Sequence, residues 1–298
     1  MKKVVQTVPN FSEGRDDKKI EQILTAFQGH PEVKVLDHER DMDHNRLVVT
    51  AIGEPGPVMK AILSAVGVAV DVIDLRQHRG QHPRMGAVDV IPFIPIKNMT
   101  MEEAVELSKE LGRKVADTYG IPVFLYEESA TEAHRKNLAD IRKGQFEGMA
   151  EKLKHPEWKP DFGKAELHPS AGVVAIGARM PLVAFNVNLD TTDMEVAHAI
   201  AKAVRHISGG LAYCKAIGVE LKERGIVQVS MNMTDFTKTP LYRAVELIRS
   251  EAKRYGVNVV GSEVVGMVPA AALIDAAAYY MGLEHFSMEQ VLEMRMME

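Results

Sequence analysis

The chain has 298 residues, and its 36 lysines and arginines against 41 aspartates and glutamates give a formal net charge of −5 at pH 7. This balance excludes a general nucleic-acid binder, which needs a broad basic face, while the length allows two modest domains with cores of their own. The single cysteine, Cys214, excludes an intrachain disulfide and favours a reducing compartment, so we expect a cytoplasmic protein.

The first half of the sequence predicts elements in the order β-α-β-β-α-β. Apolar residues recur with helical or β-type spacing over strand 3–9, helix 20–27, strand 33–36, strand 47–52, helix 58–73 and strand 88–96, and Asn10 begins a turn after the first strand. This order is the split βαβ arrangement of ferredoxin-like folds. A helix at 101–118 and a strand at 123–126 extend the sheet, and residues 127–162 are polar with short helical pieces.

The same order recurs in the second half. Its predicted elements are strand 182–189, helix 194–206, strand 212–221, strand 226–233, helix 240–255 and strand 257–265, then closing helices at 269–280 and 288–296. Residues 163–172, rich in small residues and helix breakers, predict a loop that links the halves. We therefore predict an α+β fold of two ferredoxin-like subdomains, 1–178 and 179–298, with a ligand cleft between them.

No stretch predicts a membrane span. The most apolar long segment, 257–281, is interrupted by Glu263, Pro269 and Asp275 and is too broken to cross a bilayer. Cys214 lies in an apolar run, so we interpret it as a small core residue and not as a nucleophile.

A run of acidic residues separates the two strands of the first predicted hairpin. The polar stretch before Arg46 holds Asp37, Glu39, Asp41 and Asp43. Such a run is typical of a solvated hairpin loop. In the functional alternative, one carboxylate faces the ligand and holds a cationic reacting group or orients a histidine.

The most distinctive stretch precedes strand 88–96. Nine residues contain five cationic or titratable side chains: Arg76, His78, Arg79, His82 and Arg84. Gly80 and Pro83 exclude a regular helix, so the stretch is a loop, and prolines within the strand predict that it approaches a sheet edge or bends. A cationic loop on a buried strand indicates a site for a small anionic metabolite. A solvated basic loop is the alternative.

His82 is the candidate acid/base. Neighbouring arginines would lower its pKa and keep a neutral imidazole available near pH 7; the alternative is a surface or structural histidine. His78, four residues earlier, would share a metal with it only on a helix, which Gly80 and Pro83 disfavour, so we expect no metal. The sequence has no GxGxxG motif, P-loop or CxxC pair to indicate a nucleotide or zinc site.

Polar residues also mark the second half. Asn186 and Asn188 lie two residues apart on an otherwise apolar strand and share a face, so their amides need partners that a polar cleft would supply. Arg179, just before that strand, is either a bidentate anchor for a substrate carboxylate or a surface arginine.

Eight stretches spread over nearly the whole chain resemble glutamate formiminotransferase, the transferase module of formiminotransferase-cyclodeaminase. They are VPNFSEG at 8–14, DHNR at 43–46, HPRMGAVDVIPFIP at 82–95, IRKGQFEG at 141–148, PDFG at 160–163, IGAR at 176–179, AFNVNL at 184–189 and QVSMN at 228–232.

The resemblance implies two ferredoxin-like subdomains with tetrahydrofolate, the co-substrate, bound in the cleft between them. It places the catalytic histidine at His82. The family's folate-binding loop corresponds to Gly163, Lys164, Ala165, Glu166, Leu167, His168, Pro169, Ser170, Ala171 and Gly172. Lys164, Glu166 and His168 depart from the pattern of the bifunctional proteins. The sequence also lacks the cyclodeaminase module, so we expect a separate enzyme to process the product.

The implied reaction gives these residues roles. N5 of tetrahydrofolate attacks the formimino carbon of N-formimino-L-glutamate, giving 5-formiminotetrahydrofolate and L-glutamate, a step of histidine degradation and one-carbon metabolism. His82 would act as base and then acid, and Asp37 or Glu39 would stabilise the cationic amidinium. The other expected contacts to the two substrates are Asn10, Arg46, Arg76, His78, Arg84, Arg179, Asn186 and Asn188.

Three alternatives stay open at this point. Formyl transfer from 5-formyltetrahydrofolate to glutamate would use the same pocket, and a catalytically silent folate- or amino-acid-binding protein would use it without turnover. The third alternative is a metal-dependent hydrolase. The resemblance and the apolar C-terminal helices also suggest a homodimer.

Overall fold

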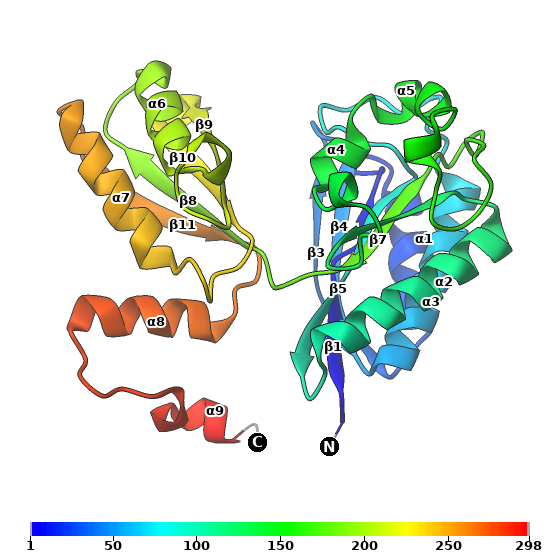
Figure 1. Cartoon of the computed structure of the whole chain (residues 1–298), viewed down its shortest axis with the longest axis horizontal. Coiled ribbons are helices and arrows are strands. Elements are labelled where there is room, and N and C mark those ends of the chain that lie inside the picture. Colours follow the sequence, from blue (N-terminus) through cyan, green and yellow to red (C-terminus); the bar gives the residue numbers. More distant parts are fainter. Residues whose placement is uncertain (1, 297–298) are drawn as a thin grey trace. The chain divides into compact units, whose positions relative to one another are not determined.

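The computed structural model describes residues 2–296, and the chain divides into two compact units, Met1–Arg179 and Met180–Glu298. Each unit contains a β-sheet with helices packed on it (Figure 1). The predicted α+β class is therefore confirmed. Each cluster of buried apolar side chains draws its members from one unit only.

The first unit is built on a mixed sheet. Its strands are β1 (Val4–Thr7), β2 (Asn10–Phe11), β3 (Val33–Asp41), β4 (Arg46–Gly53), β5 (Val88–Lys97), β6 (Val123–Glu127) and β7 (Val174–Ala178). Across the sheet, β3 is followed by β4, then by β1 and β2, which both pair with β4 and β5, and then by β5, β7 and β6. Pairings among β1 to β5 are antiparallel, whereas β5, β7 and β6 run parallel.

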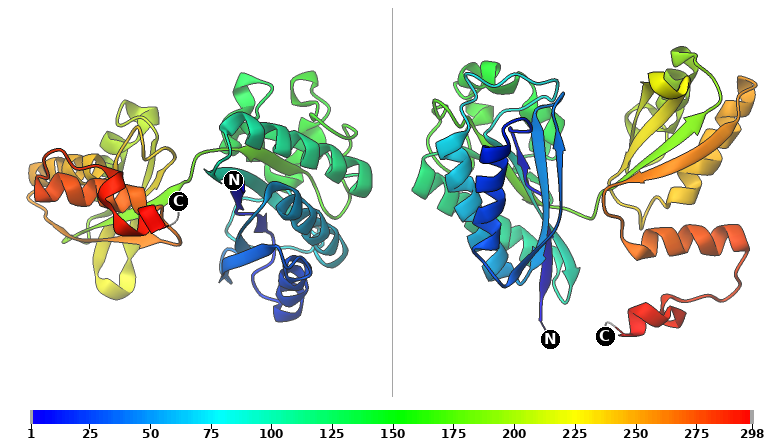
Figure 2. Two further views of the ribbon diagram at one scale, coloured as in Figure 1. Left: turned by 90° about the horizontal axis from the view of Figure 1, so that it is seen from below. Right: turned by 180° about the vertical axis from the view of Figure 1, so that it is seen from behind.

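Long helices cover one face of this sheet. They are α1 (Asp17–Gln28), α2 (Pro55–Val72) and α3 (Met101–Tyr119), and Figure 2 shows α1 and α2 side by side. Asp16 caps the first turn of α1, and Thr100 and Glu103 form a capping box at the start of α3. Leu47, Val49 and Ala51 of β4 are fully buried on this face, so Arg46, Val48 and Thr50 face the other side.

α2 alone among the described helices is long and apolar enough to cross a membrane by length and composition. Its Val58, Ile62, Ala65 and Ala69 recur at helical spacing and are fully buried against α1, α3 and the sheet. The helix therefore packs as a core helix of this unit.

Shorter helices cover part of the opposite face. These are η1 (Ala133–Arg135), α4 (Leu138–Arg142), α5 (Gln145–Lys152) and η2 (Pro156–Trp158). Ile141 and Met149 form a second buried cluster with Phe124 and Tyr126 of β6. The cluster also contains residues of β5 and β7 but none of β3 or β4. The short helices therefore cover β5, β6 and β7, and the face of β4 that carries Arg46 borders the area that they cover.

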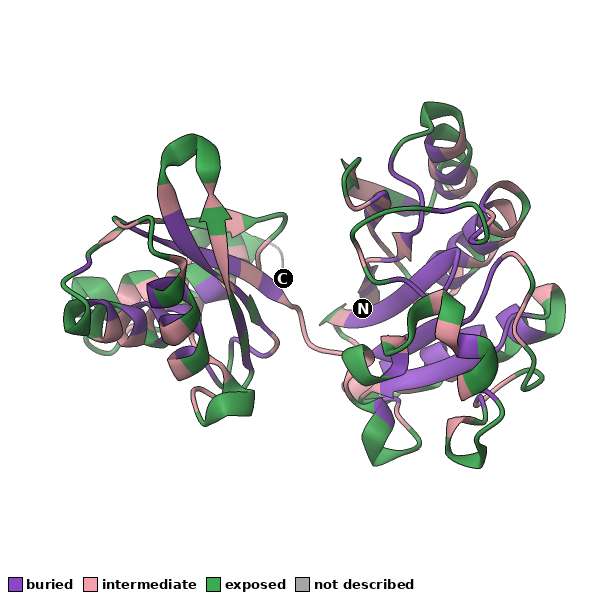
Figure 3. Cartoon of the chain, turned by 90° about the horizontal axis from the view of Figure 1, so that it is seen from above, coloured by how far each residue is buried: buried purple, intermediate pink, exposed green. Residues whose placement is uncertain are grey.

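The second unit has the element order β-α-β-β-α-β. Its elements are β8 (Val183–Leu189), α6 (Met194–Val204), η3 (His206–Ser208), β9 (Cys214–Leu221), η4 (Lys222–Arg224), β10 (Ile226–Met233), α7 (Leu241–Arg254) and β11 (Val259–Val265), then α8 (Ala270–Met281), η5 (Met288–Gln290) and α9 (Leu292–Met296). The strands lie in the order β11, β8, β10, β9, and all neighbours are antiparallel. Figure 3 shows buried residues along the strands of both units. Cys214 is buried in this core, and burial raises the pKa of its thiol to about 11.

Two predictions about the first hairpin are wrong. β3 continues through the acidic run to Asp41, and Asn10, expected in a turn, pairs with Val48 and Val90 as part of β2. β3 is an edge strand, so its charged side chains reach solvent while its backbone is still paired along β4. A sequence pattern of polarity cannot distinguish such a strand from a loop.

The predicted positions of strand 88–96 and of residues 163–172 also need correction. β5 lies inside the sheet between β2 and β7, and its register with β1 shifts between the pairs Val4–Lys97 and Val5–Pro95. Residues 163–172 do not link the units, because β7 follows them and returns to the first sheet. The division between units falls after Arg179.

Candidate active site

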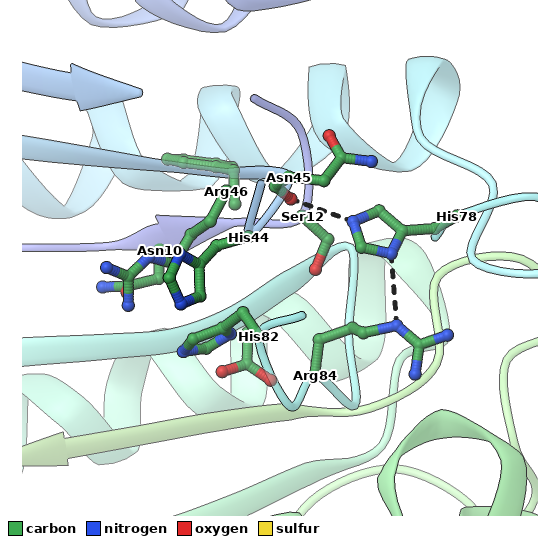
Figure 4. Close-up of a pocket in the computed structure, with 10 residues that line it drawn as sticks. Asn10, Ser12, His44, Asn45, Arg46, His78, His82 and Arg84 are labelled. Carbon is green, nitrogen blue, oxygen red and sulfur yellow. Dashed lines mark hydrogen bonds between the residues drawn. The ribbon is translucent and has the colours of Figure 1, made fainter. Parts of the chain in front are cut away.

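A pocket in the first unit collects polar side chains from three distant segments. It lies where three segments converge: β2, the turn between β3 and β4, and the cationic loop of residues 76–84, called the basic loop (Figure 4). Its lining residues are Asn10, Phe11, Ser12, His44, Asn45, Arg46, His78, His82, Arg84 and Asp89. Of the residues predicted for the site, the structure thus brings Asn10, Arg46, His78, His82 and Arg84 together.

His82 is half-buried in this pocket, and its imidazole is neutral at physiological pH. Burial, followed by the positive charges of Arg46 and Arg142, lowers its pKa from 6.5 to about 3. The ring of His44 lies across from it, with 6.3 Å between ring centroids and an interplanar angle of 67°. A neutral imidazole in a cationic pocket can accept a proton from an incoming nucleophile.

Arg46 carries a partly buried guanidinium whose hydrogen-bonding capacity the described residues do not fully satisfy. Burial and the neighbouring Arg142 lower its pKa, although Asp41, Asp89 and Glu39 raise it. Its Nε is buried and has no hydrogen-bond partner among the described residues. Buried polar atoms usually have partners, so an exception beside a pocket indicates a place where a ligand atom can bind.

Arg142 forms an ion pair with Asp89, a residue that lines the pocket. Arg142 Nε–H donates to Asp89 Oδ2 at 2.7 Å, and the backbone N–H of Met85 donates to the other oxygen at 2.8 Å. Asp89 is 1% exposed, so its charge is committed to these partners. The pair ties α4 to β5 and brings a second guanidinium near His82.

His78 and Arg84 are buried, and their polar atoms contact protein groups. His78 Nε2–H donates to the backbone oxygen of Asn45 at 2.9 Å, and its Nδ1 accepts from Arg84 Nε at 3.2 Å. Arg84 also donates to both oxygens of Glu147 at 2.6 and 2.8 Å and to Gln145 at 3.1 Å. These contacts fix the basic loop against the β3–β4 turn and α5.

Other predicted residues lie outside this pocket lining. Arg76 is exposed and forms an ion pair with Asp74 at 2.7 Å. Glu39 lies opposite Val48, on the same sheet face as Arg46, whose pKa its charge raises. Asp37 accepts the N–H of His38 at 2.8 Å and is not among the charges that act on Arg46 or His82.

The end of the predicted folate loop runs beside the basic loop. Ala171 accepts the N–H of Ala87 at 2.9 Å, and Ser170 accepts that of Leu75. Gly172 has φ +70°, and a Cβ there would collide with the carbonyl of Met85, so this approach requires glycine. His168 Nδ1 accepts the N–H of Ala171 at 3.0 Å, whereas Lys164 and Glu166 are exposed.

The amides predicted in the second half form a network within their own unit. Gln228 donates to Asn188 at 2.9 Å and to Glu263 at 2.8 Å, and Asn186 donates to Glu263 at 3.0 Å. These hydrogen bonds lower the pKa of Glu263. Arg179 belongs to the first unit, where its side chain contacts Tyr126.

The sequence did not predict four further polar or charged residues of the site, Ser12, His44, Asp89 and Arg142, nor the pocket residues Phe11 and Asn45. Ser12 Oγ donates to the Gly86 carbonyl at 2.7 Å, which joins β2 to the start of β5. All four lie inside stretches that carry the family resemblance, so that resemblance was the signal that could have found them. No group of three or more potential metal ligands occurs among residues 2–296.

Comparisons with known proteins agree over the whole chain. Residues 4–179 match the formiminotransferase domain, N-terminal subdomain, and residues 184–296 match the formiminotransferase domain. A glutamate formimidoyltransferase from Streptococcus pyogenes serotype M1 is 53% identical over 98% of each chain. The protein of the same name from Thermoplasma acidophilum is 46% identical, over 98% of this chain and 97% of its own.

Longer relatives contain the same module. The formimidoyltransferase-cyclodeaminase of Rattus norvegicus is 43% identical over 94% of this chain, a match that spans 53% of the rat protein. The pocket lies within the segment matched by the first family model, and the second family model covers most of the other unit. The chain therefore belongs to the formiminotransferase family.

Proposed function

We propose that the chain transfers the formimino group of N-formimino-L-glutamate to N5 of tetrahydrofolate, releasing L-glutamate. The full-length relatives named glutamate formimidoyltransferase support this reaction. The observation in the structure that carries it is the pairing, in one pocket, of the neutral imidazole of His82 with the unsatisfied guanidinium Nε of Arg46. One accepts a proton and the other binds an anion, and the reaction needs both.

The chemistry follows from these two groups. N5 attacks the formimino carbon, and the N5 proton passes to neutral His82 as the N5–carbon bond forms. Arg46 holds a carboxylate of the glutamate moiety, which keeps the formimino carbon beside the ring. Proton transfer by a positioned imidazole contributes about 10²–10⁴-fold in rate. The substrate carboxylate would also offset the charge of Arg46 and make His82 more basic in the complex.

Glu39 is the better of the two candidate carboxylates for the cationic amidinium. Glu39 and Asp37 both lie opposite β4 residues of the Arg46 face, but of the two only Glu39 is among the charges that act on Arg46, which supports a place near the reacting group. We propose that Glu39 stabilises the amidinium before attack and that Asp37 has no direct part.

The placement of tetrahydrofolate is also part of the proposal. Residues 163–172 run beside the strand that carries the basic loop, which supports a folate-binding role for them. The ferredoxin-like topology of subdomains 1–178 and 179–298, the cleft between them and contributions from Arg179, Asn186 and Asn188 rest on the resemblance. A homodimer rests on the resemblance and on the apolar C-terminal helices, and a cytoplasmic location rests on the cysteine content.

A His82→Ala variant tests the function. We expect the dissociation constant for tetrahydrofolate to stay within about threefold, while kcat falls by about 10²–10⁴-fold because the proton acceptor is gone. Fluorescence titration and a glutamate-release assay measure the two quantities. His38→Ala, on the exposed edge strand β3, is the matched control. An unimpaired kcat in the His82 variant would remove this residue from the mechanism.

The donor is tested in the same assay. We expect N-formimino-L-glutamate to be the better donor when it is compared with 5-formyltetrahydrofolate and glutamate in the formyl reaction. Faster formyl transfer would replace the proposed reaction by that alternative, and folate binding with neither turnover would indicate a silent binding protein. Activity that disappears on chelation and returns with a metal ion would indicate the hydrolase alternative.

A further inference from the structure

His44 lies in the pocket but has no part in the mechanism above. Its Nδ1–H donates to Asp41 Oδ2 at 2.6 Å, and its ring lies across from that of His82 (Figure 4). Because the carboxylate holds Nδ1, the other ring nitrogen, Nε2, is the one left for a ligand. A carboxylate that fixes the tautomer and orientation of an imidazole is a recurring device for proton transfer.

The turn that carries His44 is held by contacts from two other segments. The Asn45 side chain accepts the N–H of Gly14 at 2.8 Å and donates to the Arg79 carbonyl at 3.1 Å. Gln81 N–H donates to the Asp43 carbonyl at 3.1 Å.

Asn45 has φ +50°, a left-handed conformation that asparagine adopts more readily than most residues and that is typical of a tight turn. Gly14 and Gly80 pack so closely that a Cβ on either would collide with the backbone of this turn. A solvated hairpin loop, the alternative for this stretch, needs none of these contacts.

The partner of His44 Nδ1 is an ionised carboxylate. Burial tends to raise the pKa of Asp41, but hydrogen bonds from the backbone and ring of His44 outweigh it and lower that pKa. Asp41 therefore remains charged beside Nδ1. Other charged or titratable groups at the pocket are Arg46 from β4, His78 and Arg84 from the basic loop, Asp89 from β5 and Arg142 from α4.

We propose that His44, oriented by Asp41, is the second proton-transfer group of this site and protonates the departing glutamate nitrogen. This role rests on the proposed function. One ring acting as base and then as acid would have to reach both N5 and the glutamate nitrogen. Two rings on opposite sides of one pocket can each serve one nitrogen, so neither has to move between the steps.

The step balances in protons and electrons. In the tetrahedral intermediate the N5–carbon bond has formed, and its N5 proton goes to His82. The bond between carbon and the glutamate nitrogen then breaks, its electron pair stays on that nitrogen, and His44 Nε2 supplies the proton. The site begins with a proton on His44 and ends with one on His82, and exchange with solvent restores the starting state.

The experiment compares His44→Gln and Asp41→Asn with the wild-type chain. We expect kcat to fall by about 10²-fold in His44→Gln, within the range of a lost general acid, with the tetrahydrofolate dissociation constant unchanged within twofold. Asp41→Asn keeps an oxygen that can accept the backbone N–H of His44, but it loses the ionised acceptor for the ring Nδ1–H. We therefore expect a smaller fall in kcat, of about 10-fold. His38→Gln, on β3 opposite Val49, is the control.

A further measurement separates this role from a structural one. In His44→Ala, added imidazole should restore part of kcat, because 43% of the His44 side chain is exposed and a small proton donor can enter. A variant that only loosens the turn would lower the melting temperature, and imidazole would not restore its kcat.

The outcomes distinguish this proposal from the function on which it rests. A wild-type chain without formimino transfer refutes the proposed function and this role with it. An active wild type with a His44→Gln variant that retains kcat within twofold refutes this role alone. Loss of activity in His44→Ala that added imidazole does not restore also refutes it.

Discussion

Arg46 and His82 share one pocket, and the charge of the first helps to set the protonation of the second. The lowered pKa of His82 arises first from burial and then from Arg46. Arg46 in turn keeps a buried Nε without a partner among the described residues. The site thus retains an unsatisfied guanidinium N–H, which costs stability in the free protein and is available to an anionic substrate.

We expect Arg46→Gln to raise the KM for formiminoglutamate by about 10- to 100-fold, since a hydrogen bond to a charged group is worth about 1.5–3 kcal/mol. The pKa of His82 should rise from about 3 toward its ordinary value, because a positive neighbour is removed. Steady-state kinetics and NMR titration of the ring measure the two effects.

Arg40→Gln is the matched control, because Arg40 lies opposite Leu47, on the helix-covered face, and pairs with Asp17. A KM unchanged in Arg46→Gln would assign the carboxylate to another residue.

Among the elements, the basic loop depends on a contact with α5. Arg84 is 7% exposed at its side chain and binds Glu147, whose pKa is lowered to about 2 chiefly by those hydrogen bonds. A lowered carboxyl pKa stabilises the fold at pH values above 4.5, and this contribution is lost as pH falls from 4.5 toward 2. The loop that carries His82 is therefore held most firmly near neutral pH.

We expect Glu147→Gln to flatten the pH dependence of the free energy of unfolding between pH 4.5 and 2. At pH 7 the loss should be only about 1 kcal/mol, because 62% of the Glu147 side chain is exposed to solvent. Urea denaturation at several pH values measures both. Glu157→Gln, where only the backbone oxygen makes contacts, should leave the profile unchanged. A steeper profile in Glu147→Gln would contradict the assignment.

For the whole molecule, the clusters of buried side chains are confined to single units. Ile248 of α7 is fully buried in the second unit, whereas every pocket residue belongs to the first. We expect Ile248→Ala to destabilise the second unit by about 2–5 kcal/mol through lost burial and the cavity left behind.

The His82 titration should be unchanged in that variant at temperatures where the chain is folded. Denaturant unfolding and NMR test the two statements. A shifted His82 pKa would show that the second core supports the pocket.

The sequence predicted most elements because their apolar residues keep a strict period. The spacing of Ile20, Ile23 and Phe27 in α1 and the alternation along β4 are local properties. The prediction failed where pairing with a neighbouring strand decides whether a segment is a strand. Examples are the extension of β3 to Asp41 and β7, which joins the first sheet after residues 163–172. Hydrogen bonds between strands satisfy those backbones, and no local pattern records them.

The candidate site divides in the same way. The sequence by itself determined that the chain carries a cationic loop with His82 on a buried strand, because glycine, proline and charge are local signals, and the family stretches are linear motifs. Only the tertiary structure decided that His44 faces His82, that Arg46 keeps an unsatisfied Nε, and that Arg84 is bound to Glu147. His44 and His82 lie 38 positions apart in the sequence, and Arg84 and Glu147 lie 63 positions apart. Burial and charge act through space, so the order of residues along the chain does not reveal them.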